Sequence, residues 1–329
     1  MISTKSDRIN LRNLSHGVTE SPGRRPIVVR VLHLPLDEKR MGLLNQHSMK
    51  IFIPVIILLL TIASPLLIWD VRGGEPDVNA WKGPGPADSE FCGSIRNTAF
   101  NAGENLTYKV SYVLAGVSLS GGEATFKTDL EKLMGKNVYH VVAEGKSYHD
   151  LFFKVRDKYE TYIDTSTLQP YKFVRNVNEG GYKTVENVSF YKATNTVITN
   201  TGTYQVPSCI QDVLSAIFYA RNINFNQYKP NDRIPFDMFL DRQVYHLYIR
   251  YLGRETIQTK YGKFRTFKFR PLLVKGTMFE GGEKMTVWVT DDPNHIAVRV
   301  QSPITVGKVS VDMTNCQNLR YPLSSQVGQ

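Results

Sequence analysis

The sequence predicts an all-β, mainly antiparallel protein: a curved sheet or half-barrel with one central α-helix. Short segments of alternating apolar and polar residues follow one another at hairpin spacing, which is typical of half-buried strands. The chain also holds 17 Tyr and 16 Phe among 329 residues, and aromatic side chains favour strands. One segment near the middle has helical spacing instead. With 42% apolar and 21% charged residues, the composition is that of a globular protein.

The first element predicts export. Residues 51–69 are uncharged and almost wholly apolar, and Met49 and Lys50 precede them. A methionine, a positive charge and an apolar run are typical of a signal peptide, and about 20 apolar residues also suffice to span a bilayer. We therefore expect residues 49–69 to be a signal peptide or an N-terminal membrane anchor. Residues 1–48 are then a mis-assigned start or a disordered tail, and translation from Met49 is the favoured interpretation.

The elements after this segment are predicted to lie outside the inner membrane, because the basic residues on its N-terminal flank indicate a cytoplasmic N-terminal side. We expect a periplasmic or cell-envelope protein, which stays membrane-associated if the segment is uncleaved. Residues 70–90 are rich in Gly, Pro and Asp and are predicted to be a linker. A β-rich domain follows over 91–322, and 323–329 is predicted to be a tail.

Ten segments of this domain alternate as strands do, and glycine pairs or an Asp-Pro-Asn turn separate them. They lie at 106–113, 138–143, 154–163, 185–191, 196–203, 244–252, 264–269, 284–289, 296–301 and 305–313. That many strands at hairpin spacing favour an antiparallel sheet that curls toward a barrel.

The helix is predicted over 209–221. Ser208 and Gln211 have the spacing of a capping box, and the apolar residues that follow recur at helical spacing: Ile210, Val213, Leu214, Ile217 and Phe218. An amphipathic helix in a β protein is suited to cover the inside of a curved sheet.

The three cysteines carry no zinc-binding CxxC pair. In an oxidising compartment they allow three single pairings. We expect Cys92–Cys316, because this pair would join the two ends of the folded region. The alternative is that all three are buried and reduced.

The charge excludes nucleic acid as a partner. The net charge is +10, but residues 1–69 hold nine Lys/Arg and only four Asp/Glu. The rest of the chain is therefore only mildly basic, and its basic residues alternate with acids instead of clustering on one face.

Several segments resemble a known family, the bacterial envelope proteins grouped as domain of unknown function 3108. The matching pieces are FNAGENLTY at 100–108, GGEA at 121–124, QDVLSAIFYAR at 211–221, TKYGKF at 259–264 and WVTDD at 288–292. The resemblance covers about 92–320. It implies an exported, mostly β protein without an established biochemical role. The Cys-Gly at 92–93 and CQNLRYP at 316–322 are similar to the Bacteroidetes branch, and the implied fold is similar to the Lol-type lipoprotein carriers.

The helix holds the most specific family motif: Asp212, Leu214, Ser215 and Arg221. Asp212 and Ser215 share a helical face, but a nucleophilic serine needs a histidine base and an oxyanion hole, and the chain has no Gly-x-Ser-x-Gly elbow. We interpret these residues as structural: Asp212 and Ser215 bond strand backbone or Arg221 and seat the helix. The resemblance supplies no catalytic residue.

No cofactor or metal site is expected, because the histidines form no His-x-His or His-x-x-x-His pair and the glycines lack the context of a phosphate loop. A glycan- or peptidoglycan-acting enzyme would need two carboxyls converging in a cleft. The carboxyls available for it are Glu104, Glu144, Glu160, Asp157 and Asp241. Nothing else supports catalysis, so we expect a protein that is not an enzyme.

The aromatic strands suggest what the protein does instead. Either their side chains fill a core, or some line a concave apolar surface that takes a lipid or acyl group. The candidate lining is Tyr108, Tyr159, Phe173, Tyr248 and Phe267. We predict an exported envelope protein that binds a hydrophobic ligand or an envelope protein partner on a concave β face, with the helix as plug or gate. The alternative is a structural or scaffolding envelope protein without a ligand.

Overall fold

The fold was obtained as a computed structural model, which describes residues 90–92, 95–148, 154–179, 182–274, 282–304 and 307–328. Within these residues fourteen strands form one sheet, and all of its neighbouring strands are antiparallel. The strands are β1 (Glu104–Leu114), β2 (Val117–Leu133), β3 (Lys136–Ser147), β4 (Arg156–Asp164), β5 (Pro170–Glu179), β6 (Tyr182–Tyr191), β7 (Thr196–Thr199), β8 (Gly202–Gln205), β9 (Arg233–Leu240), β10 (Gln243–Thr259), β11 (Gly262–Pro271), β12 (Thr286–Thr290), β13 (Ala297–Pro303) and β14 (Lys308–Gln317).

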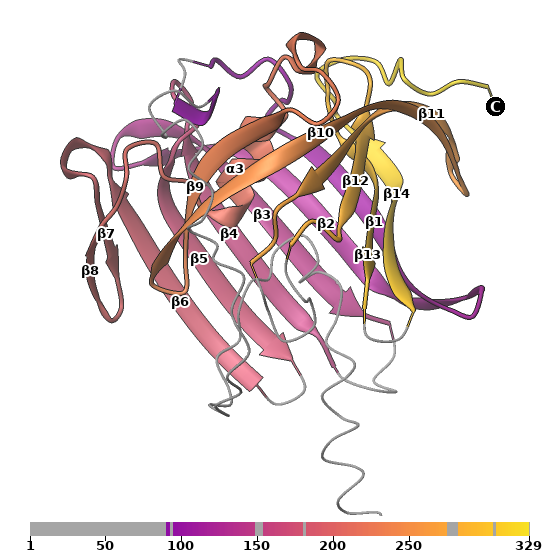
Figure 1. Cartoon of the computed structure of the whole chain (residues 1–329). Helices are drawn as coiled ribbons and strands as arrows, with labels where there is room; N and C mark the ends of the chain where they lie inside the picture. The colour runs from indigo at the N-terminus through magenta and orange to yellow at the C-terminus, as the bar shows by residue number, and fades with distance from the viewer. Residues whose placement is uncertain are drawn as a thin grey trace, which may run out of the picture. The chain divides into compact units, whose positions relative to one another are not determined.

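The strand order is β8-β7-β6-β5-β4-β3-β2-β1-β14-β13-β12-β11-β10-β9. Every pair of neighbouring strands in the sheet is therefore also consecutive in sequence, except β1 and β14, which pair in the middle. Figure 1 shows the sheet curling so that β2–β8 form one wall and β9–β13 the other. The two edge strands are β8 and β9, so the sheet is curved but not closed. The predicted fold class, a curved antiparallel sheet or half-barrel with one central helix, is confirmed.

Two-residue turns set the register of the long hairpins. Ala115 and Gly116 join β1 to β2 with φ of 47° and 82°, and Met134 and Gly135 join β2 to β3 with φ of 50° and 80°. Two successive residues in the left-handed region are what a type I′ turn needs, and its twist matches that of the flanking strands. The strands β2, β5 and β9 were not among the ten predicted segments, and 196–203 divides into β7 and β8.

The helix α3 spans Val213–Ala220, so it begins four residues later than predicted. Cys209 has a left-handed φ of 63°, which a helix does not tolerate. Gln211 is extended: its N–H donates to Asp237 O at 2.9 Å and its carbonyl accepts from Phe239 N at 2.9 Å. The backbone there serves the edge strand β9, so the predicted Ser208–Gln211 capping box is wrong. The true cap is Asp212, with Ser215 at the third helical position.

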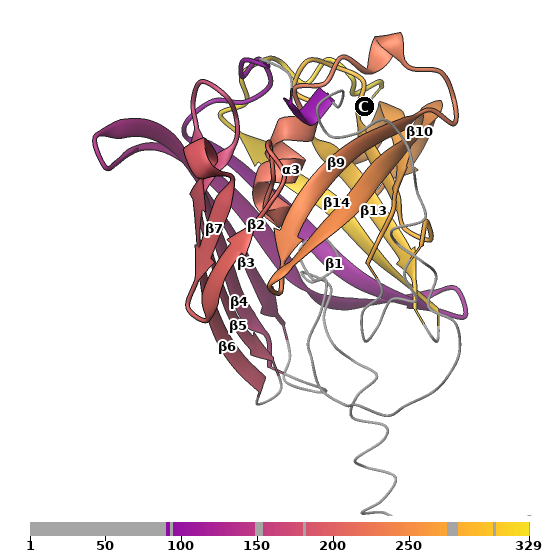
Figure 2. The ribbon, with the colours of Figure 1, turned by 60° about the vertical axis from the view of Figure 1, so that its left-hand side comes forward.

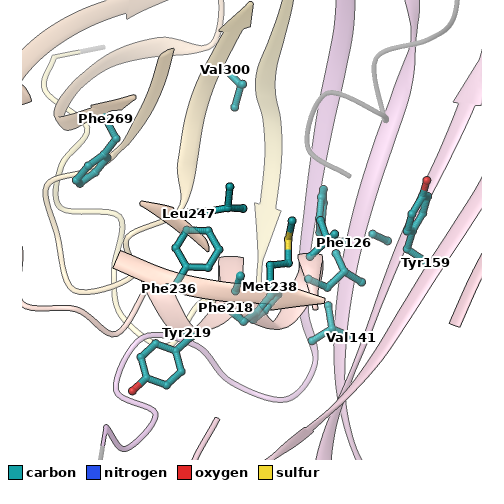
Figure 3. Close-up of a cluster of buried hydrophobic side chains, with 14 of the residues drawn as sticks. Phe126, Val141, Tyr159, Phe218, Tyr219, Phe236, Met238, Leu247, Phe269 and Val300 are labelled. Carbon is teal, nitrogen blue, oxygen red and sulfur yellow. The ribbon is translucent and has the colours of Figure 1, made fainter. Parts of the chain in front are cut away.

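Helix α3 lies inside the curve of the sheet. It contacts β4 in one wall and β9 in the other, and Figure 2 shows it between the two walls near one end of the half-barrel. Figure 3 shows buried side chains of α3 and β9 lying close together, with Phe218 and Tyr219 from α3 and Phe236 and Met238 from β9, whereas Tyr159 of β4 lies at the edge of the same core cluster. The helix thereby fills the space that the open edge between β8 and β9 leaves.

The predicted cysteine pairing is wrong. Cys92 is bonded to Cys209, with Cα atoms 5.3 Å apart, and Cys316 is a free, half-buried thiol. The reason is the position of the short 3-10 helix η2 (Glu90–Cys92). Its Phe91 stacks on Tyr219 of α3 at 4.7 Å and on Phe236 of β9 at 4.9 Å. This packing brings Cys92 to the start of the helix, whereas Cys316 lies opposite Leu106 in the middle of the sheet.

The C-terminal residues 323–328, which were predicted to be a tail, are bonded to the domain. Ser325 is buried, its N–H donates to Asp292 Oδ2 at 3.1 Å, and its carbonyl accepts from Arg265 N at 2.9 Å. The predicted signal or anchor segment 49–69, residues 1–48 and the linker 70–89 lie outside the described residues. In the part of the chain that is described, no helix has the length and apolar character needed to cross a bilayer.

Candidate functional site

The N-terminal end of α3 is fixed to the sheet through Asp212. This carboxylate accepts from Leu214 N at 2.8 Å and Ser215 N at 2.9 Å, and Ser215 Oγ accepts from Asp212 N at 2.9 Å. Thr161 Oγ1 on β4 donates to the second carboxylate oxygen at 2.6 Å. Burial raises the pKa of Asp212 to about 6, against the opposing effect of these donors. Asp212 and Ser215 therefore cap the helix and join it to β4.

The C-terminal end of α3 is fixed through Arg221. Its guanidinium donates to both oxygens of Glu104 on β1, at 2.6 and 2.8 Å, and its Nε donates to the carbonyl of Asn294 at 3.0 Å. Arginine and glutamate are both buried, and the guanidinium lies over the ring of Phe100 at 5.3 Å. A bidentate pair of this kind gives orientation as well as attraction. The helix is thus held at both ends, and Leu214 packs in the core between them.

A cavity of about 220 Å³ lies between α3 and the sheet. Its walls come from one face of α3, from β1 and β2, and from β9 to β12, and they are almost wholly apolar. The helix contributes Ala216, Ile217 and Ala220, and the opposite wall contributes Phe236, Met238 and Leu247 among others. The small alanines leave the space that a larger side chain would fill.

The basic groups at the cavity wall are already paired. Arg221 is neutralised by Glu104. His295 donates from Nδ1 to the carbonyl of Arg221 at 2.7 Å, and burial lowers its pKa, so its neutral form is favoured. Among the lining residues that the structure describes, the cavity therefore meets no unpaired charge, and it suits an uncharged, apolar group.

A comparison with models of protein families matches residues 107–314, more than half of the chain, to the family described as "Protein of unknown function (DUF3108)". The chain belongs to this family. The predicted family is thereby confirmed, over a range somewhat shorter than the 92–320 of the resemblance. The matched range contains α3 with its two anchors Asp212 and Arg221, but not the partner of Arg221, Glu104.

Two solved structures are similar to this family member at low sequence identity. One is a β-barrel-like protein of domain of unknown function DUF1849 from Brucella abortus, with 8% identity and a TM-score of 0.47, covering 68% of this chain and 99% of that chain. The other is a candidate exported protein with a YmcC-like fold from Bacteroides fragilis, with 11% identity and a TM-score of 0.33, covering 68% and 99%. No curated protein matches the chain.

Of the five predicted lining residues, Tyr108 lies in the cavity wall and the other four do not. Tyr159 and Phe173 are buried in the opposite wall, on β4 and β5. The hydroxyl of Tyr248 donates to Glu283 Oε1 at 2.5 Å. Phe267 packs on Phe225, with ring centroids 5.5 Å apart. The prediction is corrected for these four positions: strand alternation gives the buried side, but not which buried residues border a void.

The sequence reasoning missed the lining from α3 and β9. The small residues Ala216 and Ala220 lie four apart on one face of α3, and Phe236 and Met238 lie two apart on β9. The helical and strand periods were the available signals. Neither period shows that these two faces oppose each other, because this depends on how β9 folds back over the helix.

The five carboxyls that were considered for an enzyme are distributed over different surroundings. Glu104 binds Arg221, Glu144 and Glu160 point to the outer face of the sheet, and Asp241 contacts Arg175. Asp157 lies within hydrogen-bonding reach of Glu179, a residue that was not predicted. Within the described ranges, no three His, Cys, Asp or Glu side chains are arranged to hold a metal ion.

Proposed function

We propose that this chain is an exported envelope protein that binds a small, uncharged hydrophobic group in the cavity between α3 and the sheet, and that it is not an enzyme. The observation that carries the proposal is the cavity itself: about 220 Å³, apolar on nearly all sides and without an unpaired charge. The export part rests on the sequence of residues 49–69. The periplasm is the compartment that this segment indicates.

The volume limits the ligand. A cavity of about 150 Å³ holds benzene, and most sites for drug-sized molecules exceed about 300 Å³. A cavity of about 220 Å³ therefore suits a single ring system or the end of one acyl chain. Each buried methylene contributes about 0.8 kcal/mol, so about six of them would contribute about 5 kcal/mol before the losses of association. This is enough for reversible binding, as a carrier needs.

The test is the binding of an uncharged fluorescent probe with a single fused ring system, 1-naphthylamine, to the full chain. Ala216→Leu fills the cavity from the helix, and Ala193→Leu makes the same change on an exposed residue of the 3-10 helix η3 (Lys192–Thr194). We expect the first variant to bind the probe at least about tenfold more weakly and the second to bind it as the parent does. Both variants keep residues 51–69, so any probe that this segment binds contributes equally to the two and does not affect the comparison between them. Equal binding by the two variants, or no binding by the parent, would contradict the proposal.

A structural role without a ligand is the second candidate, and one observation favours it. The β1–β2 hairpin carries two apolar side chains on its surface, Val117 at 60% and Leu119 at 48% exposure. Exposed apolar side chains that cluster are typical of contact with a partner protein. Native mass spectrometry of protein from the cell envelope separates the two candidates: a retained mass that extracts as lipid supports the carrier, and a clean mass supports the scaffold.

A further inference from the structure

Two polar groups in the wall of the cavity keep a hydrogen-bonding atom that no described residue uses. The first is the hydroxyl of Tyr108 on β1, and the second is Nε2 of His295, in the turn between β12 and β13. Apart from Arg221, the other lining residues are apolar. Polar atoms in such surroundings are normally bonded, so these two atoms require an explanation.

The Tyr108 side chain is only 3% exposed, and it borders the cavity. Its ring packs edge-on against Phe126, with centroids 5.6 Å apart. Burial raises the pKa of its hydroxyl, and the charges of Arg221 and Glu104 act on it through space, but no hydrogen bond reaches it from the described part of the chain. The hydroxyl of Tyr159 differs, because it is enclosed in the opposite wall. Tyr108 therefore places an unused donor at the cavity.

His295 uses only one of its two ring nitrogens. Nδ1 donates to the carbonyl of Arg221 at 2.7 Å, and this bond fixes the proton on Nδ1 because a carbonyl oxygen only accepts. Burial lowers the pKa of His295, which favours the neutral ring. Nε2 is then an acceptor, and none of the described residues donates to it. The ring is held beside Phe225 and Phe267, at centroid distances of 5.1 and 5.6 Å.

Both groups belong to the part of the wall around Arg221. The Tyr108 hydroxyl lies within the electrostatic range of the Arg221 guanidinium, and His295 bonds the Arg221 backbone. The guanidinium itself is neutralised by the bidentate bond to Glu104. The cavity thus has an apolar body and one polar end, and that end offers one donor and one acceptor without a net charge.

This combination selects a hydroxyl group. A hydroxyl both accepts and donates, so it can accept from Tyr108 and donate to Nε2 of His295. A carboxylate would bring a second negative charge beside Glu104, and an ammonium group would bring a second positive charge beside Arg221; like charges repel strongly at a buried site. A plain hydrocarbon would leave both polar atoms buried and unbonded.

We propose that the ligand of the cavity is an uncharged alcohol or phenol, whose hydroxyl accepts from Tyr108 and donates to Nε2 of His295. This inference rests on the proposed function, because it names the ligand class of the same cavity. It also gives the ligand an orientation: the hydroxyl lies near Arg221 at the C-terminal end of α3, and the apolar part extends past Ala216.

The test is a competition experiment on the full chain, in which naphthalene and 1-naphthol displace the 1-naphthylamine probe. The two compounds have the same ring system and differ only in the hydroxyl. A wholly apolar cavity would favour naphthalene, because a hydroxyl loses its bonds to water when it is buried without a partner. The two proposed bonds reverse this order. We expect 1-naphthol to displace the probe at a concentration at least about fivefold lower than naphthalene does.

The variants locate the hydroxyl. Tyr108→Phe removes only the donor, and we expect it to weaken 1-naphthol binding about tenfold and to leave naphthalene binding unchanged. Tyr159→Phe is the matched control, because it removes a buried hydroxyl that does not border the cavity, and it keeps the parent's preference. His295→Asn removes Nε2 and should also abolish the preference. Its amide N–H can still donate to the Arg221 carbonyl, and asparagine tolerates the left-handed φ of 44° at this position.

The outcomes separate this inference from the proposed function. If the parent does not bind the probe, or if neither compound displaces it, the cavity is not a binding site and both proposals fail. If both compounds bind but naphthalene binds at least as tightly as 1-naphthol, or if Tyr108→Phe keeps the preference for 1-naphthol, only the hydroxyl assignment is wrong. If Tyr108→Phe does not fold, His295→Asn decides the question.

Discussion

Replacing Cys92 and Cys209 together by serine removes the bridge between η2 and the start of α3. The two residues are 117 apart in sequence, and the chain-entropy relation for a loop of that length gives about 5 kcal/mol at 25 °C. Measured losses on removing native disulfides are typically about 2–5 kcal/mol. We expect the double variant to lose an amount in this range, because the rest of the domain still packs Phe91 on Tyr219 and Phe236.

The assay is urea unfolding at equilibrium, with and without a reducing agent. The double variant has a lower midpoint than the parent, and the reductant lowers the parent to the level of the variant without affecting the variant further. Cys316→Ser is the control, because Cys316 forms no bridge, and it keeps the parent midpoint and its response to the reductant. If Cys316→Ser instead lost the stability and the double variant did not, the pairing described here would be refuted.

Three further predictions concern buried carboxyls. Glu104→Gln leaves the buried guanidinium of Arg221 without its counter-charge, so we expect it to lower the free energy of unfolding in urea by about 3–5 kcal/mol. The control Glu123→Gln breaks an ion pair at the surface and costs at most about 1 kcal/mol. Similar losses in the two variants would disprove the prediction. Asp212 has a folded-state pKa of about 6, above its ordinary 3.8, so the stability it contributes is complete below pH 3.8 and is lost as the pH rises through about 6. Asp212→Asn can still cap the helix but does not titrate. We expect it to lack the decline of about 3 kcal/mol in the free energy of unfolding that the parent shows in urea between pH 4 and 7. A parallel pH profile for parent and variant would count against this prediction. Burial raises the pKa of Glu179 to about 9, so the parent loses stability as the pH rises toward 9. Glu179→Gln should reduce that loss, measured by thermal unfolding up to alkaline pH. An unchanged pH profile would show that the pair of Glu179 and Asp157 does not hold the proton.

The strands show how far the sequence reasoning reached. Alternation identified segments such as 106–113 and 296–301, because one face of each is more deeply buried than the other. It missed β9, where residues 236–240 are all buried. Phe236 and Met238 of that strand border the cavity, and Phe239 packs on Tyr204 of β8 with ring centroids 5.4 Å apart. The strand is therefore buried on both faces, and such a strand does not alternate. The fold class followed from the many strands that alternate, and the missing strands did not change it.

The candidate site was less accessible from the sequence, because it depends on which distant faces oppose each other. Tyr108 was predicted as lining and lies in the cavity wall, whereas Tyr159 has the same pattern and lies among charged side chains instead. The Cys92–Cys209 bond was missed for the same reason. It depends on Phe91 packing against α3, and the spacing of residues along the chain does not predict that contact. Local periods determine the elements, whereas the curvature of the sheet determines which of their faces meet and form a site.

The pairing of β1 with β14 has a consequence for how the chain folds. Every other pair of neighbouring strands joins segments that follow each other in sequence, so two runs of hairpins, β1–β8 and β9–β14, can form from local contacts alone. The central seam, where Asn105 meets Gln317, joins residues from opposite ends of the domain. Contacts of such long sequence separation form slowly because a large loop must close first. The domain should therefore assemble as two meanders that dock at their outermost strands, with the seam at the middle of the finished sheet as the last part to form.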